Sequence, residues 1–372
     1  MRIALLTTGL VKYTSLLANA LVDNCSVCFV GLQYRNDVAR DEDFQKSVRS
    51  WFRPEVQICL PSKWRKRDPR NLWAVARAVR YLRAWKPDLI HIQVDYDYRI
   101  ALTLLAMRQT PCVDTIHDAR PHLGEYELYA RKLDWNTRHP VRRHARRIIV
   151  HGNAIKRELM SSDKISADKI VVIPHPAYEL FKRYRDPHAV VESNCVLFFG
   201  RIWPYKGLDV LIQAEPEVSA TFPDVTFLVA GEGQDLEPYR AAMVHPERFE
   251  VHNRYLSDQE VARYFERAAI VVAPYREASQ SGVIAIAFVM GRPVIVTSVG
   301  ALAEAVTHGV TGLVIPPEDP KALALAIIQL LKDPDLRARM GEAGAAMARG
   351  PLSAARVAKE TIEVYRAILI RS

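Results

Sequence analysis

The chain alternates short apolar runs with longer segments in which apolar residues return every three to four positions. Continuous apolar runs are typical of strands buried on both faces, whereas the longer period predicts amphipathic helices. In the first half this pattern predicts strands at residues 2–8, 26–31, 56–61, 88–94, 112–117, 147–150 and 169–174. It predicts helices between them at 13–22, 71–85, 98–107 and 153–160, with Asn153 as the N-cap of the last.

The second half repeats the alternation. Strands are predicted at 196–199, 225–230, 249–252, 270–273, 293–297 and 312–315, and helices at 207–222, 258–268, 282–290, 321–331 and 354–370. Strands that alternate with helices form a parallel sheet with helices on both faces. The fold class is therefore α/β, with two Rossmann-like doubly wound parallel-sheet domains that we expect to face each other across a cleft.

Composition agrees with two soluble domains, since the chain has 372 residues, of which 49% are hydrophobic and 25% charged. The first residues lack the apolar run of a signal peptide, and no segment approaches the roughly 20 apolar residues of a membrane span. The five cysteines fall in strand-like segments, which favours buried thiols over zinc or redox chemistry. We therefore predict a cytoplasmic protein, with peripheral binding to the inner face of the membrane.

Charge is distributed unevenly along the chain. Residues 1–175 hold 30 Lys and Arg against 18 Asp and Glu, a net charge of +12, whereas residues 176–372 carry a net charge of −3. Such an asymmetry points to an anionic partner for the first half, nucleic acid or a membrane surface, or else to a solvated basic face. The basic residues gather at Lys63-Trp64-Arg65-Lys66-Arg67 and Arg70, and at Arg77, Arg80 and Arg83 on the next predicted helix.

Candidate chemistry centres on the segment FFGRIWPYKG, in which a buried strand ends at Gly200 and two cations, Arg201 and Lys206, follow. A loop that leaves the carboxyl end of a parallel strand is where open α/β sheets bind their ligands. A guanidinium fork and a flexible ammonium together suit a diphosphate, although two ordinary surface cations would give the same pattern.

Two further loops of the second half follow predicted strands in the same way. Gly231-Glu232-Gly233 would let a ligand approach the backbone, or forms a plain turn. The helix that begins near Gly282 offers unpaired N–H groups and a positive dipole end to a phosphate. Ser281 could donate to the same phosphate oxygens, or simply cap the helix.

At these residues the second half resembles the donor-binding domain of the GT-B glycosyltransferases, in particular the retaining group classed as family 4. The resemblance rests on FFGRIWPYKGLDVLI, FLVAGEG, APYREASQSGVIAIAFVMGRPVIVTSVGALAEAV and HGVTGLVIPPEDPKALALAI, which cover nearly all of residues 195–335. The first half is similar to the family more weakly, through PDLIHIQ, TIHDARP and RRIIVHGNAIKREL. The resemblance implies an acceptor-binding domain at 1–175, completed by a final helix at about 352–372, and a donor-binding domain at 176–351.

The resemblance also implies roles for single residues. Arg201 and Lys206 would hold the donor diphosphate, Glu277 would face the donor sugar, and His117 would approach the transferred sugar. The donor would also be bound at Gly9, Gly200, Gly231, Glu232, Gly233, Ser281, Gly282 and Val283. For His117, a partly buried histidine with only a structural role is the alternative.

This sequence departs from the family at three points. The second acid of the E-x7-E motif, which holds the ribose, is replaced by Ala285 or Ile286, depending on the count. Because neither side chain can accept a hydrogen bond, ribose binding must differ or be looser. Glu277 is one residue out of register, which an insertion around residues 279–281 would repair. The Thr7-to-Val11 loop carries one glycine, Gly9, where many relatives have two.

The resulting hypothesis is a glycosyltransferase that moves a sugar from a nucleotide-diphosphate sugar to a hydroxyl acceptor with retention, in polysaccharide, glycolipid or other glycoconjugate synthesis. A nucleotide-sugar epimerase and a non-catalytic nucleotide-sugar-binding scaffold are the alternatives. No D-x-D motif lies near the donor loops, so we expect no cofactor and no metal. Expected partners are the donor, a glycan, lipid-linked or small-molecule acceptor and an anionic membrane surface. We expect no nucleic acid.

Overall fold

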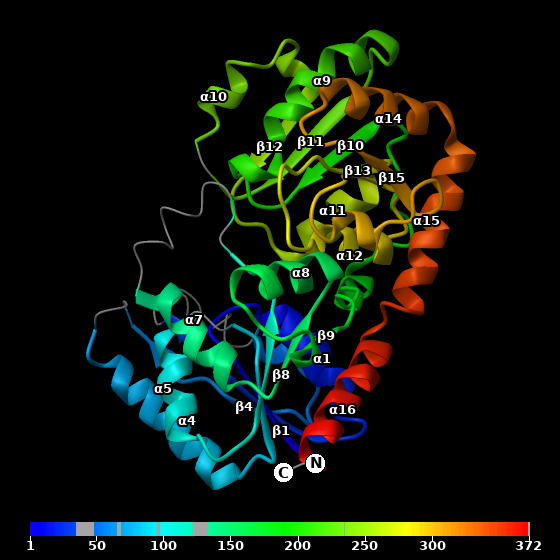
Figure 1. Cartoon of the computed structure of the whole chain (residues 1–372). Coiled ribbons are helices and arrows are strands. Elements are labelled where there is room, and N and C mark those ends of the chain that lie inside the picture. The colour runs from blue at the N-terminus through cyan, green and yellow to red at the C-terminus, as the bar shows by residue number, and fades with distance from the viewer. Residues whose placement is uncertain are drawn as a thin grey trace. The chain divides into compact units, whose positions relative to one another are not determined.

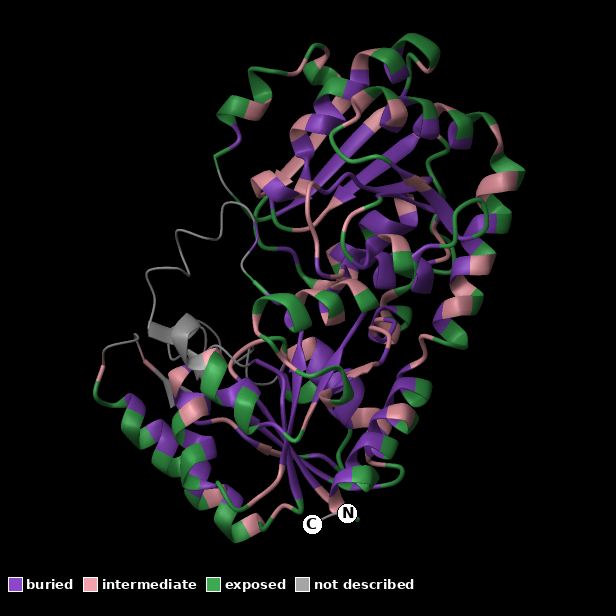
Figure 2. Cartoon of the chain, in the orientation of Figure 1, coloured by how far each residue is buried: buried purple, intermediate pink, exposed green. Residues whose placement is uncertain are grey.

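The computed structural model describes residues 1–34, 48–64, 68–94, 97–120, 122, 133–233 and 235–370. The chain forms two compact units. Unit 1 comprises Met1–Ala119, Glu127–Pro176 and Ala354–Ser372, and unit 2 comprises Arg120–Tyr126 and Ala177–Ser353. Each unit is built on its own sheet, whose strands are largely buried (Figure 2).

The sheet of unit 1 has seven parallel strands within the described residues. Its order is β4 (Gln57–Cys59), β2 (Ser26–Gly31), β1 (Arg2–Thr7), β6 (Leu89–Ile92), β7 (Cys112–Ile116), β8 (Arg147–Val150) and β9 (Ile170–Val172). All seven strands predicted for this half are present, several of them shorter than predicted. A two-stranded sheet of β3 (Gln33–Tyr34) and β5 (Ser62–Lys63), which is too short to leave a pattern, was not predicted.

Helices cover both faces of this sheet (Figure 1). One face packs against α1 (Val11–Leu21) and α16 (Ala354–Leu369), and the other against α4 (Asn71–Trp85), α5 (Tyr98–Ala106), α7 (Leu133–His144) and α8 (Asn153–Ser162). The N-cap of α8 is Gly152, so the prediction of Asn153 as the cap is wrong by one residue. Helix α7 was missed because it contains Pro140 and few apolar residues.

The sheet of unit 2 has six parallel strands within the described residues. Its order is β12 (Phe249–Asn253), β11 (Thr226–Gly231), β10 (Cys195–Phe199), β13 (Ile270–Ala273), β14 (Val294–Thr297) and β15 (Gly312–Ile315). The chain moves outward from β10 to β12 and then crosses to β13. This reversal creates a topological switch point between β10 and β13, where doubly wound sheets bind ligands.

Two helices, α9 (Leu208–Thr221) and α14 (Pro320–Lys332), cover one face of this sheet. On the other face, Phe265 of α11 (Asp258–Arg267) packs edge-on against Phe199 at 5.2 Å between ring centroids. Helix α12 (Gly282–Val289) packs against α15 (Pro334–Arg349). Helix α15 was not predicted from the sequence pattern. Two glycines and three alanines between residues 341 and 346 blur the helical period of α15, because they stand where larger apolar residues would otherwise mark its buried face.

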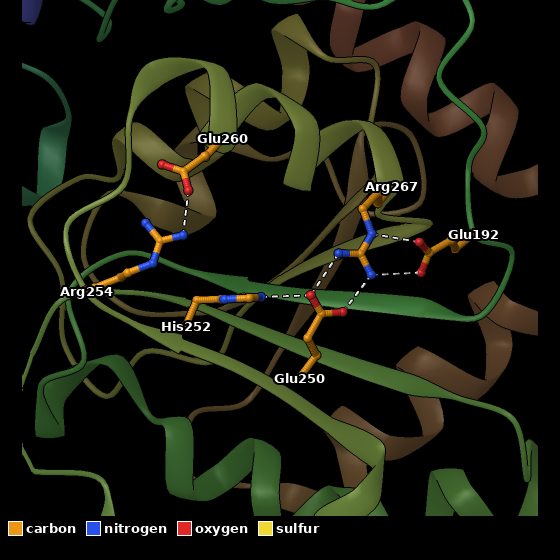
Figure 3. A network of polar contacts seen from close by, with 6 residues as sticks. All are labelled: Glu192, Glu250, His252, Arg254, Glu260 and Arg267. Carbon is orange, nitrogen blue, oxygen red and sulfur yellow. Dashed lines mark hydrogen bonds and ion pairs between the residues drawn. The ribbon is translucent and has the colours of Figure 1, made fainter.

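An ion-pair network joins β12 to α11 in unit 2 (Figure 3). Arg267 contacts Glu192 (Nε to Oε1) and Glu250 (Nη2 to Oε2), both at 2.6 Å. His252 Nε2 contacts the other Glu250 oxygen at 2.7 Å. The hydrogen bond from Arg267, followed by that from His252, lowers the pKa of Glu250 from 4.5 to about 2 against the opposing effect of burial.

This shift makes the stability of unit 2 acid-sensitive. Because the folded-state pKa is depressed, the network's contribution is fully present above about pH 4.5 and is lost as pH falls towards about 2. Glu250→Gln should therefore flatten the acid limb of the stability-versus-pH curve, measured by urea unfolding. Glu342→Gln, which removes an exposed pair with Arg349, is the control and should leave that limb as steep as in the wild type. Equal slopes for wild type and Glu250→Gln would contradict the prediction.

Candidate active site

The loops that follow β10 and β13 meet at the switch point of unit 2. The first contains Arg201, Tyr205 and Lys206, and the second contains Tyr275 and Arg276. The backbone N–H of Arg276 donates to the Tyr205 carbonyl at 2.8 Å, which joins the two loops directly. Both loops leave the carboxyl ends of adjacent strands, as expected for a ligand site in a doubly wound sheet.

The two candidate diphosphate ligands share one aromatic neighbour. Arg201 is exposed, and its Nη2 donates to Tyr205 Oη at 3.2 Å. Lys206 Nζ lies 3.8 Å from the centroid of the Tyr275 ring and 5.0 Å from that of Tyr205. Burial lowers the pKa of Lys206, but Tyr275 and Tyr205 raise it more, so the net shift is upward and the ammonium stays charged. The structure therefore holds this cation with aromatic rings, and among the described residues no ion pair neutralises it.

Arg276 fixes the shape of the cation loop, a role that sequence reasoning missed. Its Nη1 donates to the Pro204 carbonyl and to Asp209 Oδ1, both at 2.8 Å, and its Nε contacts Glu318 Oε1 at 3.0 Å. The hydrogen bonds that Arg276 donates to the Asp209 carboxylate are the main cause of a raised pKa for Arg276. An arginine directly after the strand-end Ala-Pro-Tyr was the available signal, but only the fold shows that its partners lie on the preceding loop.

The glycines predicted to bind the donor, Gly200, Gly231 and Gly233, let the backbones of the loops after β10 and β11 approach each other closely. Gly200 has φ +118° and Gly231 has φ +146°, conformations that other residues rarely adopt. A Cβ on Gly231 would lie 2.0 Å from the Gly200 carbonyl oxygen, and one on Gly233 would lie 2.2 Å from that of Ile202. Glu232 is exposed, and its carbonyl accepts from the Ile202 N–H at 3.1 Å. The close neighbour of these glycines is thus the loop after β10, a protein backbone.

The N-terminus of α12 lies beside the same loop. A Cβ on Gly200 would come 3.7 Å from Val283 Cγ2, and one on Gly282 would come 3.1 Å from the Tyr178 ring. Ser281 is buried and caps the helix, because its Oγ accepts from the Val283 N–H at 3.3 Å, and it also contacts Tyr275 Oη at 3.2 Å. The capping alternative for Ser281 is therefore the one seen in the structure.

Glu277 lies before the first residue of α12, and the two candidate positions for the second motif acid, Ala285 and Ile286, lie after it. Glu277 is half-buried in the loop before it. Ala285 and Ile286 are buried within α12, so neither motif position offers a carboxylate to a ribose. The three residues at which an insertion was expected, 279–281, form a loop, where an extra residue does not interrupt the helix.

In unit 1, His117 follows β7 and belongs to a buried ring cluster. Its ring centroid lies 4.5 Å from Tyr13 and 5.0 Å from His151. Among the described residues neither ring nitrogen of His117 has a hydrogen-bond partner, nor has His151 Nε2. Burial, followed by the nearby His151 and His175, holds the pKa of His117 well below its usual range. The imidazole is therefore neutral at pH 7.

His175 completes this cluster, with ring centroids 5.2 Å from Tyr13 and 5.1 Å from His151. It is thus packed against the cluster. His151 was missed by sequence reasoning, although its position directly after a predicted strand was a signal. Gly9, a predicted donor residue of unit 1, follows β1, and its N–H donates to Thr7 Oγ1 at 3.1 Å.

Asp97, which follows β6, has a structural role. Asp97 caps α5 by accepting from the Arg99 N–H at 2.9 Å, and its carboxylate pairs with the buried Arg99 guanidinium at 2.6 Å. Asp95 lies outside the described residues. All five cysteines are buried free thiols.

Among the described residues, no group of three or more His, Cys, Asp and Glu side chains has the arrangement of a metal site. Of the helices in that part of the chain, none has the length and apolarity needed to cross a bilayer.

Two family models match the chain. The model described as glycosyltransferase family 4 matches residues 7–177, and the model described as glycosyl transferases group 1 matches residues 193–333. Together they span most of both units.

Individual proteins agree with these models. The α-D-kanosaminyltransferase of Streptomyces kanamyceticus is 27% identical over 69% of this chain and 71% of its own length. The structure of Anabaena Alr3699/HepE in complex with UDP and glucose superposes with a TM-score of 0.76 and 18% identity, over 99% of this chain and 100% of that one. A Neisseria meningitidis UDP-GlcNAc 2-epimerase bound to UDP-GlcNAc superposes with a TM-score of 0.63 and 14% identity, over 99% and 100%. At such identities the two superpositions establish the fold, which is GT-B.

Proposed function

This chain belongs to glycosyltransferase family 4, and on that premise we propose that it transfers a sugar from a nucleotide-diphosphate sugar to a hydroxyl acceptor with retention at the anomeric carbon. In this proposal unit 2 binds the donor and unit 1 the acceptor. The observation that carries it is the pair of cations, Arg201 and Lys206, held on one loop at the switch point of unit 2.

In the proposed reaction, the bond between the anomeric carbon and the diphosphate breaks, and negative charge develops on the leaving phosphate. Arg201 and Lys206 stabilise that charge, and the N-terminus of α12 adds its dipole. Because the loop is already fixed by Arg276, the cations need little reorganisation as the charge forms. The departing phosphate oxygen takes the acceptor proton, so no side-chain nucleophile is required.

His117 and Glu277 would act on the transferred sugar. A neutral His117, with both ring nitrogens without a hydrogen-bond partner among the described residues, has both a donor and an acceptor to offer a sugar hydroxyl. Buried polar groups normally have partners, so this histidine favours a ligand. Glu277 is proposed to face the donor sugar, and ribose to be held without the second motif acid. No metal is part of the proposal, and activity should survive a chelator.

The donor base is proposed to be uracil, because the structurally similar Anabaena Alr3699/HepE forms complexes with UDP and with UDP-glucose. The acceptor is a glycan, lipid-linked or small-molecule hydroxyl in glycoconjugate synthesis. We also propose an anionic membrane surface as the partner of the basic unit 1, with the protein on the inner face of the membrane. Nucleic acid is not proposed, because no nucleic-acid motif accompanies the charge.

The epimerase alternative agrees with the fold, but similarity in sequence does not support it. The likeness to the Neisseria enzyme is one of fold alone, whereas the Streptomyces kanamyceticus protein, a relative in sequence, is named a transferase. Purified protein incubated with radiolabelled nucleotide sugars, with and without lipid extract, separates the possibilities. Transfer of label to an acceptor with the donor's anomeric configuration supports the proposal. An inverted product refutes retention, acceptor-independent epimerisation supports the alternative, and binding without turnover supports a scaffold.

His117→Ala should lower turnover while leaving nucleotide-diphosphate affinity, measured by calorimetry, within a few fold. The reason is that His117 is proposed to contact the transferred sugar, and the diphosphate is bound by unit 2. His175→Ala, at the edge of the same ring cluster, controls for packing. Should His117→Ala lose thermal stability while keeping full activity per folded molecule, the structural role of this histidine would be its only role.

A further inference from the structure

We propose that the outer face of α4 and α5 docks on an anionic lipid bilayer by inserting Leu72, Trp73, Leu102 and Leu105 among the lipid headgroups. We call these four residues and the arginines around them the α4–α5 face. The inference rests on the membrane partner proposed above and assigns it a place on unit 1. It differs from the place that the sequence indicated.

The segment Lys63-Trp64-Arg65-Lys66-Arg67 places a tryptophan among cations, and tryptophan is enriched at membrane interfaces, so the sequence alone predicts that Trp64 contacts the membrane. Instead Trp64 packs against the hydrophobic core of unit 1, and its backbone N–H donates to Asn71 Oδ1 at 3.0 Å. Its indole nitrogen is buried as well. That prediction for Trp64 is therefore wrong, and Arg65, Lys66 and Arg67 lie outside the described residues.

A different tryptophan is exposed. Trp73 is 77% exposed and Leu72 is 60% exposed, both on the first turn of α4, and Leu105 on α5 is 65% exposed. With Leu102 at 36%, these are four of the seven large hydrophobic side chains exposed in the described part of unit 1. The two helices lie side by side on one face of the sheet (Figure 1), so the apolar side chains share one surface. Single exposed apolar residues are ordinary, but a group of them marks an interaction site.

The charged residues of the two helices all have one sign. Neither α4 nor α5 contains an Asp or Glu. Arg77, Arg80 and Arg83 are exposed on α4, and Arg108 is exposed just beyond α5. Arg83 Nη2 donates to the Ala106 carbonyl at 3.2 Å, which places its cation at the end of α5. A surface that combines exposed Trp and Leu with cations is complementary to an anionic membrane interface.

The basic surface continues into a cavity where phosphate-bearing headgroups would fit. This cavity measures about 620 Å³, and Arg108 lines it together with Arg143, Arg146, Arg147 and Lys169. Asp168 is the one acidic residue of its lining. Partial desolvation is the main cause of a lowered pKa for Lys169, which agrees with a cation already drawn into a recess.

The face is preformed rather than dependent on binding. The buried pair of Arg99 with Asp97, at 2.6 Å, fixes the first turn of α5, and Arg99 Nη1 reaches Asn71 Oδ1 at the first residue of α4. A polynucleotide would use the arginines but not the aliphatic side chains, because its affinity comes from phosphate contacts. The leucines therefore favour a bilayer.

Sedimentation with vesicles tests the proposal. The wild type should bind vesicles of phosphatidylcholine mixed with phosphatidylglycerol, release with salt, and not bind phosphatidylcholine alone. W73S/L105S should weaken binding about tenfold or more, since the apolar contribution is lost. R77E/R80E should abolish it. Tyr255→Ser, which removes a side chain 67% exposed on unit 2, is the matched control and should bind like the wild type.

Calorimetry with a nucleoside diphosphate separates this inference from the proposed reaction, because every variant should keep wild-type affinity for it. Wild-type vesicle binding by W73S/L105S would overturn the insertion of these side chains. An absence of binding to anionic vesicles at low salt would overturn the docking face, even if transfer to a soluble acceptor is observed. Displacement of the protein from vesicles by DNA in substoichiometric amounts would identify nucleic acid as the partner and likewise overturn it.

Discussion

Lys206→Ala and Arg201→Ala should each lower turnover by about 10² or more, which is the scale for removing one preorganised group that stabilises developing charge. Each cation is proposed to meet the leaving diphosphate from the same loop. Lys206 is held over the Tyr275 ring at 3.8 Å, so the position of its charge is set before the donor binds. Steady-state kinetics with the donor identified in the labelling assay measure the effect.

The control for these variants is Arg240→Ala, which removes an exposed cation of unit 2 that pairs with Glu237 on the short helix α10 (Glu237–Arg240). It should leave turnover unchanged. Thermal unfolding should show that all three variants fold, because each position is on the surface or in a loop. Near-normal turnover of both Lys206→Ala and Arg201→Ala would refute their assignment to the diphosphate.

Gly231→Ala should destabilise unit 2 by about 3 kcal/mol or more. Two costs combine at this position. The backbone has φ +146°, which alanine rarely adopts, and the new Cβ would lie 2.0 Å from a carbonyl oxygen of the adjoining loop. A backbone oxygen cannot rotate away as a flexible side chain can.

Gly9→Ala is the matched control for this change. Gly9 also follows a strand, but a Cβ there would have no heavy atom within 4 Å, and its φ is outside the positive range. Its free energy of unfolding should shift by less than about 1 kcal/mol. Urea unfolding measures both variants, and a wild-type midpoint for Gly231→Ala would show that the loops after β10 and β11 separate at little cost.

Several features of the site were within reach of the sequence. The loop with Arg201 and Lys206 was predicted from a buried strand that ends in glycine, and the structure does place it at the switch point of its sheet. The start of α12 at Gly282 was predicted as well. Arg276 was beyond reach because its partners, Asp209 and Glu318, are far from it in the chain. No local pattern specifies such a pairing.

By itself the sequence determined the class of fold. Every predicted strand is present, because a run of apolar residues that is buried on both faces differs in pattern from an amphipathic helix, and the pattern is local. Strand order and contacts between loops were decided only in the tertiary structure. Whether Trp64 or Trp73 faces solvent depends on which side of α4 meets the sheet, and whether Gly231 faces a ligand or a backbone depends on the strand beside it. The exposure of these tryptophans and the neighbour of Gly231 depend on contacts with residues distant in the chain. A local hydrophobic period carries no information about such contacts.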